Sequence, residues 1–404
     1  MLKLSASYIF PVASPPVKNG IISIDDDGTI VNVSAPGDAD DSIEFYEGII
    51  CPGFINTHCH LELSHFKGHM AEKAGMTQFI REILSKRPHF SAEEIRKGVE
   101  AGEAEMIKNG IVAVGDISND SSTFAQKAKG NLIYHTFIEA FDLNPVRAND
   151  VFKTAVDLKT QLSQIPHLQS HISIVPHAPY TVSDALFKLI ADEAVKNNSI
   201  ISIHNQESLT ESELFISKSG QMYDAFTKAG IDMGFAEMTG KNSLRSIFNK
   251  LPLTQKILLV HNTFTSAEDI QWANEQISKY NNQQPTTNNQ QLFWCTCPNA
   301  NLYIENTLPD YDVFIKTNAA VTIGTDSLAS NWSLSVLDEL KTIVKHQPHI
   351  SSELLLTWAT KNGAELLGLD QLGTIEKGKK PGLNLLKNVD GLRITGDTEV
   401  VKLV

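Results

Sequence analysis

The feature that most constrains the fold is an alternation of short apolar runs with longer amphipathic stretches across residues 51–369. The eight strand-like runs are 53–60, 111–117, 132–140, 172–176, 200–204, 257–261, 292–297 and 320–325. The eight helix-like stretches are 92–108, 121–128, 151–162, 183–195, 211–217, 267–277, 311–316 and 335–345. Strands that alternate with helices in this way usually pair in parallel. The pattern predicts an α/β protein with a (β/α)8 barrel. A doubly wound open sheet is the alternative, but the chain lacks the glycine-rich loop that would favour it.

The two chain ends have a different pattern from the middle. Residues 21–24 and 29–33 are rich in β-formers and are separated by Asp-Asp-Asp-Gly, which is a hairpin signal. Residues 370–404 show the same short β-rich runs between glycine turns. Because neither end is long enough to be stable alone, we expect residues 1–50 and 370–404 to form one composite β-sandwich beside the 51–369 barrel.

Composition narrows the class of protein and of partner. The 404 residues are 42% hydrophobic and 20% charged, as in an ordinary globular chain, and the net charge is −13. Such a charge argues against a nucleic acid or an anionic membrane as the main partner. Four cysteines are too few for a disulfide framework, and no apolar stretch has the length of a membrane span. We therefore expect a cytoplasmic protein that acts on a small molecule. A homodimer stays open.

The most informative motif is Cys-Pro-Gly-Phe-Ile-Asn-Thr-His-Cys-His-Leu-Glu at residues 51–62. Its apolar run leads into His58 and His60, two positions apart. Side chains alternate between the faces of a strand, so these two imidazoles point the same way and Cys59 points the other way. Two imidazoles side by side at a strand end make half of a metal site.

Polar residues also close later strand-like runs. They are His177, His204, His261 and Asp326. The carboxyl ends of parallel strands meet on one face of a barrel, where active sites lie. A single strand-end histidine is as readily a hydrogen-bonded packing residue, but five imidazoles and a carboxylate that converge point to a site. We predict one divalent metal ion held by His58, His60, His204 and Asp326. Zn²⁺ is expected, with Fe²⁺ or Mn²⁺ as alternatives.

Glu207 lies three residues after His204, in His-Asn-Gln-Glu. Once the chain leaves the strand and turns, this carboxylate can reach the substrate side of the metal, which is a general acid–base position. Its other interpretation is a helix-start glutamate favoured by the helix dipole. We expect His261 to hold or polarise the attacking water and His177 to orient the substrate.

Four strings resemble the amidohydrolase superfamily over essentially the whole chain. They are Gly-Phe-Ile-Asn-Thr-His-Cys-His-Leu-Glu-Leu-Ser, Ile-His-Asn-Gln-Glu, Leu-Val-His-Asn and Gly-Thr-Asp-Ser-Leu-Ala-Ser-Asn. They are most similar to its metal-dependent deaminase and chlorohydrolase branch, and within it to aminodeoxyfutalosine, S-adenosylhomocysteine and adenosine deaminases. The resemblance implies the same four metal ligands, with Glu207 as the catalytic glutamate and His261 as the strand-six histidine.

Two details of the resemblance bear on the site. Two-metal members usually carry a bridging lysine at the end of the third or fourth strand, and neither 132–139 nor 171–177 contains a lysine. The resemblance therefore implies one metal ion. The string Cys-Pro-Arg/Lys-Ser-Asn of many members is Cys-Pro-Asn-Ala-Asn here, with Asn299 and Ala300 replacing the basic residue and the serine. This departure leaves the substrate open.

We predict a hydrolytic deaminase of an amino-substituted heteroaromatic ring, of the adenine nucleoside type exemplified by aminodeoxyfutalosine. Metal-activated hydroxide attacks, Asp326 takes the water proton, and Glu207 protonates the ring nitrogen before ammonia leaves. Glu62, Glu139 and His177 are the predicted substrate contacts. One alternative is hydrolysis of another C–N or C–halide bond at the same site, as in a cyclic amide, guanine or a triazine. The other is a non-catalytic barrel that binds a ligand, which would have no need of Glu207.

Overall fold

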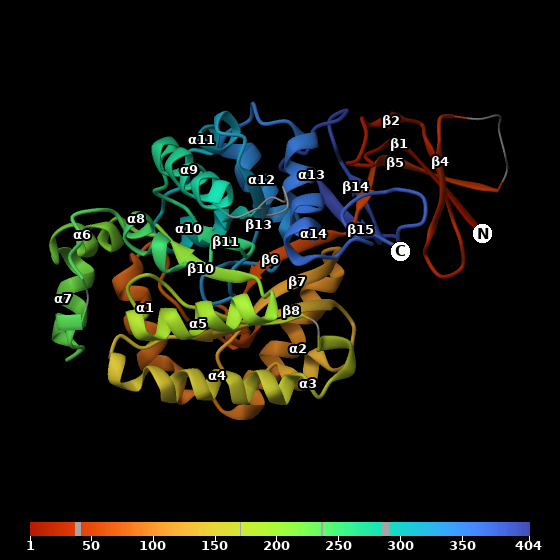
Figure 1. Cartoon of the computed structure of the whole chain (residues 1–404). Coiled ribbons are helices and arrows are strands. Elements are labelled where there is room, and N and C mark those ends of the chain that lie inside the picture. The colour runs from red at the N-terminus through yellow and green to blue at the C-terminus, as the bar shows by residue number, and fades with distance from the viewer. Residues whose placement is uncertain (37–41, 170, 236, 284–290) are drawn as a thin grey trace.

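The computed structural model describes residues 1–36, 42–169, 171–235, 237–283 and 291–404. Strands and helices alternate through the middle of the chain, and the strands of both chain ends gather at one side of the molecule (Figure 1).

Every one of the eight predicted strand-like runs is a strand. The first sheet has the order β6 (Phe54–Cys59), β7 (Ile111–Ser118), β8 (Ile133–Ala140) and β9 (Ile172–Pro176). The second has the order β10 (Ile201–Asn205), β11 (Ile257–His261), β12 (Leu292–Thr296) and β13 (Ala320–Ile323). All pairs within both sheets are parallel, as the alternation predicted. The α/β class is confirmed, with the ladders arranged as two sheets of four strands.

The two sheets contact each other at both of their edges, between β9 and β10 and between β6 and the loop after β13. On one side His204 N donates to His177 O at 3.0 Å, just after β9. On the other side Thr325 N and Asp326 N each donate to His58 O at 3.0 Å, and Cys59 forms a parallel bridge with Asp326. These contacts bring the carboxyl ends of strands from both sheets to one place.

Neighbouring residues of the strands pack into different cores. On β7, Val114 belongs to the large core that includes residues of the surrounding helices, whereas Ala113 belongs to a second core. On β8, Ile138 and Phe137 divide in the same way. Because both faces are buried, these strands appear in the sequence as continuous apolar runs.

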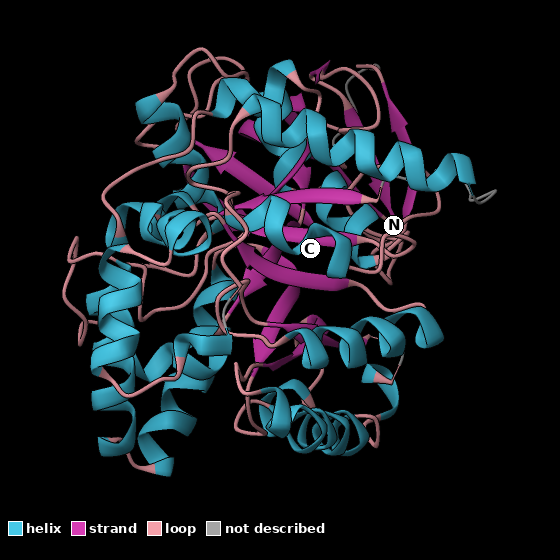
Figure 2. Ribbon diagram, turned by 60° about the vertical axis from the view of Figure 1, so that its left-hand side comes forward, coloured by secondary structure: helices cyan, strands magenta, loops and turns pink. Residues whose placement is uncertain are grey.

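Helices lie around the strands (Figure 2). Those that match predicted stretches are α2 (Ala92–Lys108), α3 (Phe124–Lys127), α4 (Ala148–Leu162), α5 (Asp184–Asn197), α6 (Leu209–Ser217), α9 (Ala267–Gln283), α11 (Tyr311–Lys316) and α12 (Val336–His346). Those without a predicted counterpart are α1 (Met76–Lys86), α7 (Gly220–Lys228), α8 (Ser243–Ile247), α10 (Pro298–Ile304), α13 (Ser352–Ala359) and α14 (Lys361–Leu367). Short 3-10 helices are η1 (Leu61–Phe66), η2 (Arg87–His89), η3 (Pro145–Arg147), η4 (Pro166–Leu168), η5 (Met233–Phe235) and η6 (Phe248–Lys250). None of the helices in the described part of the chain is long and apolar enough to cross a membrane.

The strands of the chain ends form one sheet in the order β15-β14-β5-β1-β3-β4, with β2 paired to β1. Their bounds are β1 (Leu2–Ile9), β2 (Val17–Lys18), β3 (Ile21–Ile24), β4 (Ile30–Ser34), β5 (Ile43–Pro52), β14 (Leu383–Lys387) and β15 (Glu399–Lys402). The two ends meet where β14 pairs antiparallel with β5. The expected joint sheet is therefore present, whereas its division into two sandwich layers and the boundaries at residues 50 and 370 stay predictions.

Candidate active site

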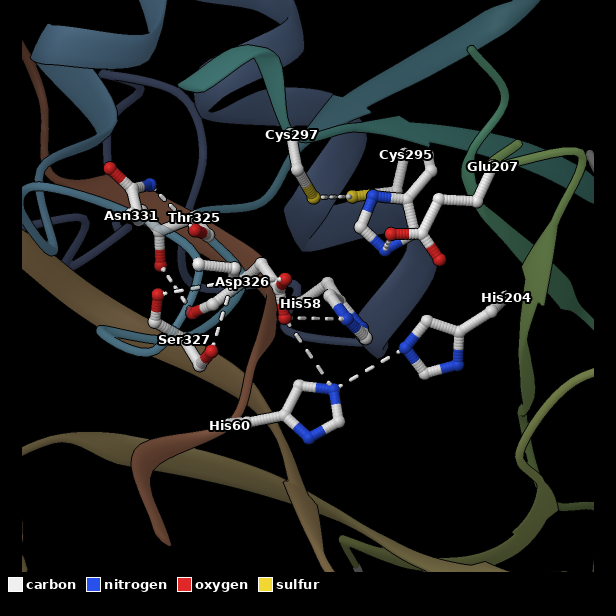
Figure 3. Close-up of polar contacts among 12 residues, drawn as sticks. His58, His60, His204, Glu207, Cys295, Cys297, Thr325, Asp326, Ser327 and Asn331 are labelled. Carbon is white, nitrogen blue, oxygen red and sulfur yellow. Dashed lines mark hydrogen bonds and ion pairs between the residues drawn. The ribbon is translucent and has the colours of Figure 1, made fainter. Parts of the chain in front are cut away.

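Three imidazoles converge at the carboxyl ends of β6 and β10. His58 lies on β6, His60 follows its last residue, and His204 lies on β10. His60 Nε2 is 3.4 Å from His204 Nε2, and the ring centroid of His58 is 4.9 Å from each of the other two. Figure 3 shows the three rings pointing toward one another, with Asp326 beside them. The strand-face argument for His58 and His60 therefore holds.

Asp326 joins this cluster from the loop after β13. Its Oδ1 lies 3.6 Å from Nε2 of both His58 and His60, and its Oδ2 accepts a hydrogen bond from Ser330 Oγ. Burial alone would raise the pKa of Asp326, but the neighbouring imidazoles hold this pKa well below its usual range. The side chain is therefore a carboxylate. Its backbone has a φ of 55°, a left-handed conformation that is uncommon outside glycine and is enriched at functional sites.

These residues fit a zinc-class ion. His58 is fully buried, and neither of its ring nitrogens has a hydrogen-bond partner among the described residues. Buried polar atoms almost always have a hydrogen-bond partner or a bound ion, so the two unpartnered nitrogens of His58 are what a metal ligand would present. Zn–N distances of about 2.0–2.1 Å in a tetrahedral site place ligand atoms about 3.4 Å apart. The observed spacings of 3.4 and 3.6 Å match that geometry.

Protonation also suits metal binding. Burial lowers the pKa of His60 to about 3 and that of His204 well below its usual range, so both rings are neutral near pH 7. His204 Nδ1 donates to His177 O at 2.7 Å, which fixes the tautomer and leaves the Nε2 lone pair facing the cluster. A second group, Glu139, His177 and His204, also has closely spaced ligand atoms. Since His204 Nδ1 already donates to a carbonyl, that group does not form an independent second metal site.

An acid and a base face each other beside the cluster. Glu207 Oε1 lies 3.4 Å from His261 Nε2. Burial, reinforced by the charges of Asp326 and Glu211, raises the pKa of Glu207 well above its usual range. Burial lowers the pKa of His261 to about 4, and His261 Nδ1 donates to Asn301 Oδ1 at 3.0 Å. A protonated carboxyl and a neutral imidazole are therefore available for proton transfer near neutral pH.

A cavity of about 860 Å³ opens from this cluster. Its polar lining includes His60, His204, Glu207, His261 and Asp326. The lining also includes apolar side chains, among them Phe79, Ile80 and Ile83 of α1, Phe226 of α7 and Phe235 of η5. Its volume lies in the range of about 300–1,000 Å³ that is typical of small-molecule sites.

The predicted substrate contacts divide into two groups. Glu139 and His177 line the cavity. Glu62 lies behind Asn119, whose backbone N–H donates to Glu62 Oε2 at 2.8 Å while its Nδ2 donates to Glu139 Oε2 at 2.8 Å. Burial raises the pKa of Glu62 to about 8 and that of Glu139 to about 7. A direct contact between Glu62 and substrate stays a prediction.

The structure adds residues that the sequence did not single out. Asn119 and Arg87 line the cavity, and Asn301 orients His261. Asn119 directly follows β7, so the strand-end signal that found the histidines could have found it. Arg87 follows an unpredicted helix and had no such signal.

Asn299 and Ala300, where this chain differs from the string Cys-Pro-Arg/Lys-Ser-Asn, do not line the cavity. Asn299 N donates to Glu339 Oε2 at 2.7 Å, and Asn299 Oδ1 accepts from Thr342 Oγ1 at 2.5 Å. Ala300 is fully buried within the core that also holds Ala113.

Comparison with known proteins gives consistent matches. A model described as the amidohydrolase family matches residues 49–402. The chain is 25% identical over 355 residues to an adenosine deaminase of Helicobacter pylori, covering 85% of this chain and 80% of that protein. The crystal structure of Helicobacter pylori aminofutalosine deaminase in complex with methylthio-coformycin matches with a TM-score of 0.81 at 22% identity, over 96% of this chain and 93% of that one. Atrazine chlorohydrolase TrzN from Arthrobacter aurescens, complexed with zinc, matches with a TM-score of 0.73 at 18% identity, over 98% and 89%.

Proposed function

The chain belongs to the amidohydrolase family, and from that premise we propose that it is a metal-dependent deaminase of an adenine-type nucleoside. The reaction replaces the ring amino group with oxygen from water and releases ammonia. The observation that carries this proposal is the buried cluster of His58, His60 and His204, beside a cavity whose lining includes His60, His204 and Glu207.

The proposed metal ligands are His58, His60, His204 and Asp326, holding one ion, with zinc expected. The absence of a lysine from β8 and β9, and the engaged Nδ1 of His204, support a single ion. When bound, such an ion supplies Lewis-acid activation of a water molecule.

The remaining steps fall to the side chains of the chain itself. Glu207 is buried and protonated, so it can donate its proton to the ring nitrogen next to the carbon that carries the amino group. His261 Nε2 carries no proton, because Nδ1 donates to Asn301, so Nε2 is able to accept a hydrogen bond from the attacking water. The Asp326 carboxylate lies beside His58 and His60 and is placed to accept the water proton. Glu139 and His177 would contact the substrate from the cavity wall.

The shape of the cavity supports a substrate larger than a bare ring. Its lining combines the polar reacting groups with apolar side chains of α1 and α7. An adenine nucleoside with an apolar substituent on its sugar would suit this division. The similarity to an adenosine deaminase, and to a structure that holds methylthio-coformycin, points to the same class.

We also infer that the two four-stranded sheets close into one (β/α)8 barrel. The hydrogen bonds across β9 and β10, and those between His58 and the loop after β13, support this closure. Residues 51–369 would form the barrel and residues 1–50 with 370–404 the second unit, a division consistent with the ladder between β5 and β14.

The test is ammonia release from a panel of adenosine and its sugar-substituted analogues by zinc-loaded protein. We expect release from at least one adenine nucleoside and no release after chelation. Turnover of a chlorotriazine with chloride release, and of no aminopurine, would instead favour the second candidate reaction. The chlorotriazine assay is included because the chain matches the structure of a triazine chlorohydrolase.

A further inference from the structure

The turn that carries Glu207 is strained and tightly held. Strand β10 ends at Asn205 and helix α6 begins at Leu209, so only three residues form the turn between the strand and the helix. Gln206 has a φ of 46°, in the left-handed region that non-glycine residues seldom adopt. Such a conformation persists only where the surrounding structure enforces it.

Glu211 is the first restraint on this turn. Its carboxylate is fully buried, and its two oxygens accept from Gln206 N at 3.0 Å and from Glu207 N at 3.1 Å. A glutamate at this place in a helix normally reaches back to the residue that caps the helix. Here the cap is Ser208, and Glu211 bypasses it to bind the two preceding amides.

The loop after β11 is the second restraint. Phe264 N donates to Gln206 O at 3.1 Å, and Thr265 Oγ1 donates to Gln206 Oε1 at 2.6 Å. This loop begins directly after His261. The segments that carry Glu207 and His261 are thereby joined into one unit, which sets the 3.4 Å approach of the two side chains.

Resting on the deaminase function proposed above, we propose that Glu211 and Thr265 are positioning residues that hold Glu207 in line for proton transfer. The Glu207 carboxylate has one polar partner recorded among the described residues, the His261 imidazole. Its placement therefore depends on the backbone at residue 207. Neither Glu211 nor Thr265 is among the cavity-lining residues described, so both act through the turn.

The test is Glu211→Gln, with two readouts. This isosteric change puts an N–H donor against one of the two backbone donors, so one amide loses its acceptor. We expect kcat to fall about 10- to 100-fold, the scale of a misplaced catalytic group, with KM and metal content nearly unchanged. Amide hydrogen exchange at residues 206 and 207 should be at least about tenfold faster, since a lost hydrogen bond lowers local protection.

Glu103→Gln is the matched control. Glu103 is also buried, and its carboxylate accepts from Tyr134 OH and Asn131 Nδ2, each at 2.9 Å, away from the cavity. This variant should lose stability but keep kcat. If Glu211→Gln does not fold, Thr265→Val takes its place with the same two readouts.

Unchanged exchange at residues 206 and 207, or an equal loss of kcat in the Glu103 control, would overturn the proposal. The exchange measurement needs no substrate. If the wild-type protein deaminates nothing, the proposed function fails while the exchange result still decides whether Glu211 holds the turn.

Discussion

Replacing Glu207 with Gln is the sharpest perturbation of the proposed chemistry. The amide has the same shape as the carboxyl and can still hydrogen-bond to His261 Nε2, which lies 3.4 Å from Glu207 Oε1. It cannot give up a proton and take it back. The four proposed metal ligands are untouched, so metal content should stay near one ion per chain.

The expected loss is that of one general acid–base step. Its magnitude is at least about 100-fold in kcat, or about 2.7 kcal/mol in the activation free energy. KM should change far less, because the lost interaction belongs to the transition state. Burial raises the pKa of Glu207, which favours the protonated carboxyl that the variant cannot form.

The assay is steady-state ammonia release at saturating substrate, with metal content measured on the same samples. A Glu207→Gln protein that retains metal and turns over within a few-fold of wild type would refute the reasoning. Glu207 would then not be the general acid–base residue of the site.

Three further outcomes are expected. His204→Ala should lower metal content and activity together, measured by elemental analysis and ammonia release; loss of activity with metal retained would contradict the ligand assignment. Burial raises the pKa of Glu211 to about 7, so between about pH 4.5 and pH 7 the folded state keeps a proton that the unfolded state loses. The unfolding free energy of the wild type should therefore fall, relative to that of Glu211→Gln, by up to about 3 kcal/mol as pH rises to 8; denaturant titrations showing no pH-dependent difference would count against it. Deleting residues 1–36 should expose the edge of β5 that β1 covers and cause aggregation, visible by light scattering; a monodisperse product would oppose this expectation.

The strands could be predicted because burial on both faces leaves continuous apolar runs in the sequence. The run that became β9 matched its strand at both ends. Helix α7 was not predicted, because it is an extra element within one strand-to-strand connection and the alternation of the barrel units carries no information about it. The parts of the cavity wall that come from such insertions were therefore missed.

The site could be predicted where one residue marks a strand end. His58, His60 and His204 meet as expected because strand geometry alone fixes their direction. Asn301 contacts His261 from a helix 40 residues further along the chain, and Glu211 binds the backbone of a strained turn. The spacing of apolar and polar residues in the sequence carries no information about such contacts, so the structure was needed to reveal them.

The most direct test of the central claim is a metal titration of chelated protein, followed by ammonia release from a substrate found in the nucleoside panel. The account predicts no activity without metal and a linear rise that stops at one equivalent of zinc per chain. A break at two equivalents, or activity that does not depend on added metal, would contradict a single ion held by His58, His60, His204 and Asp326.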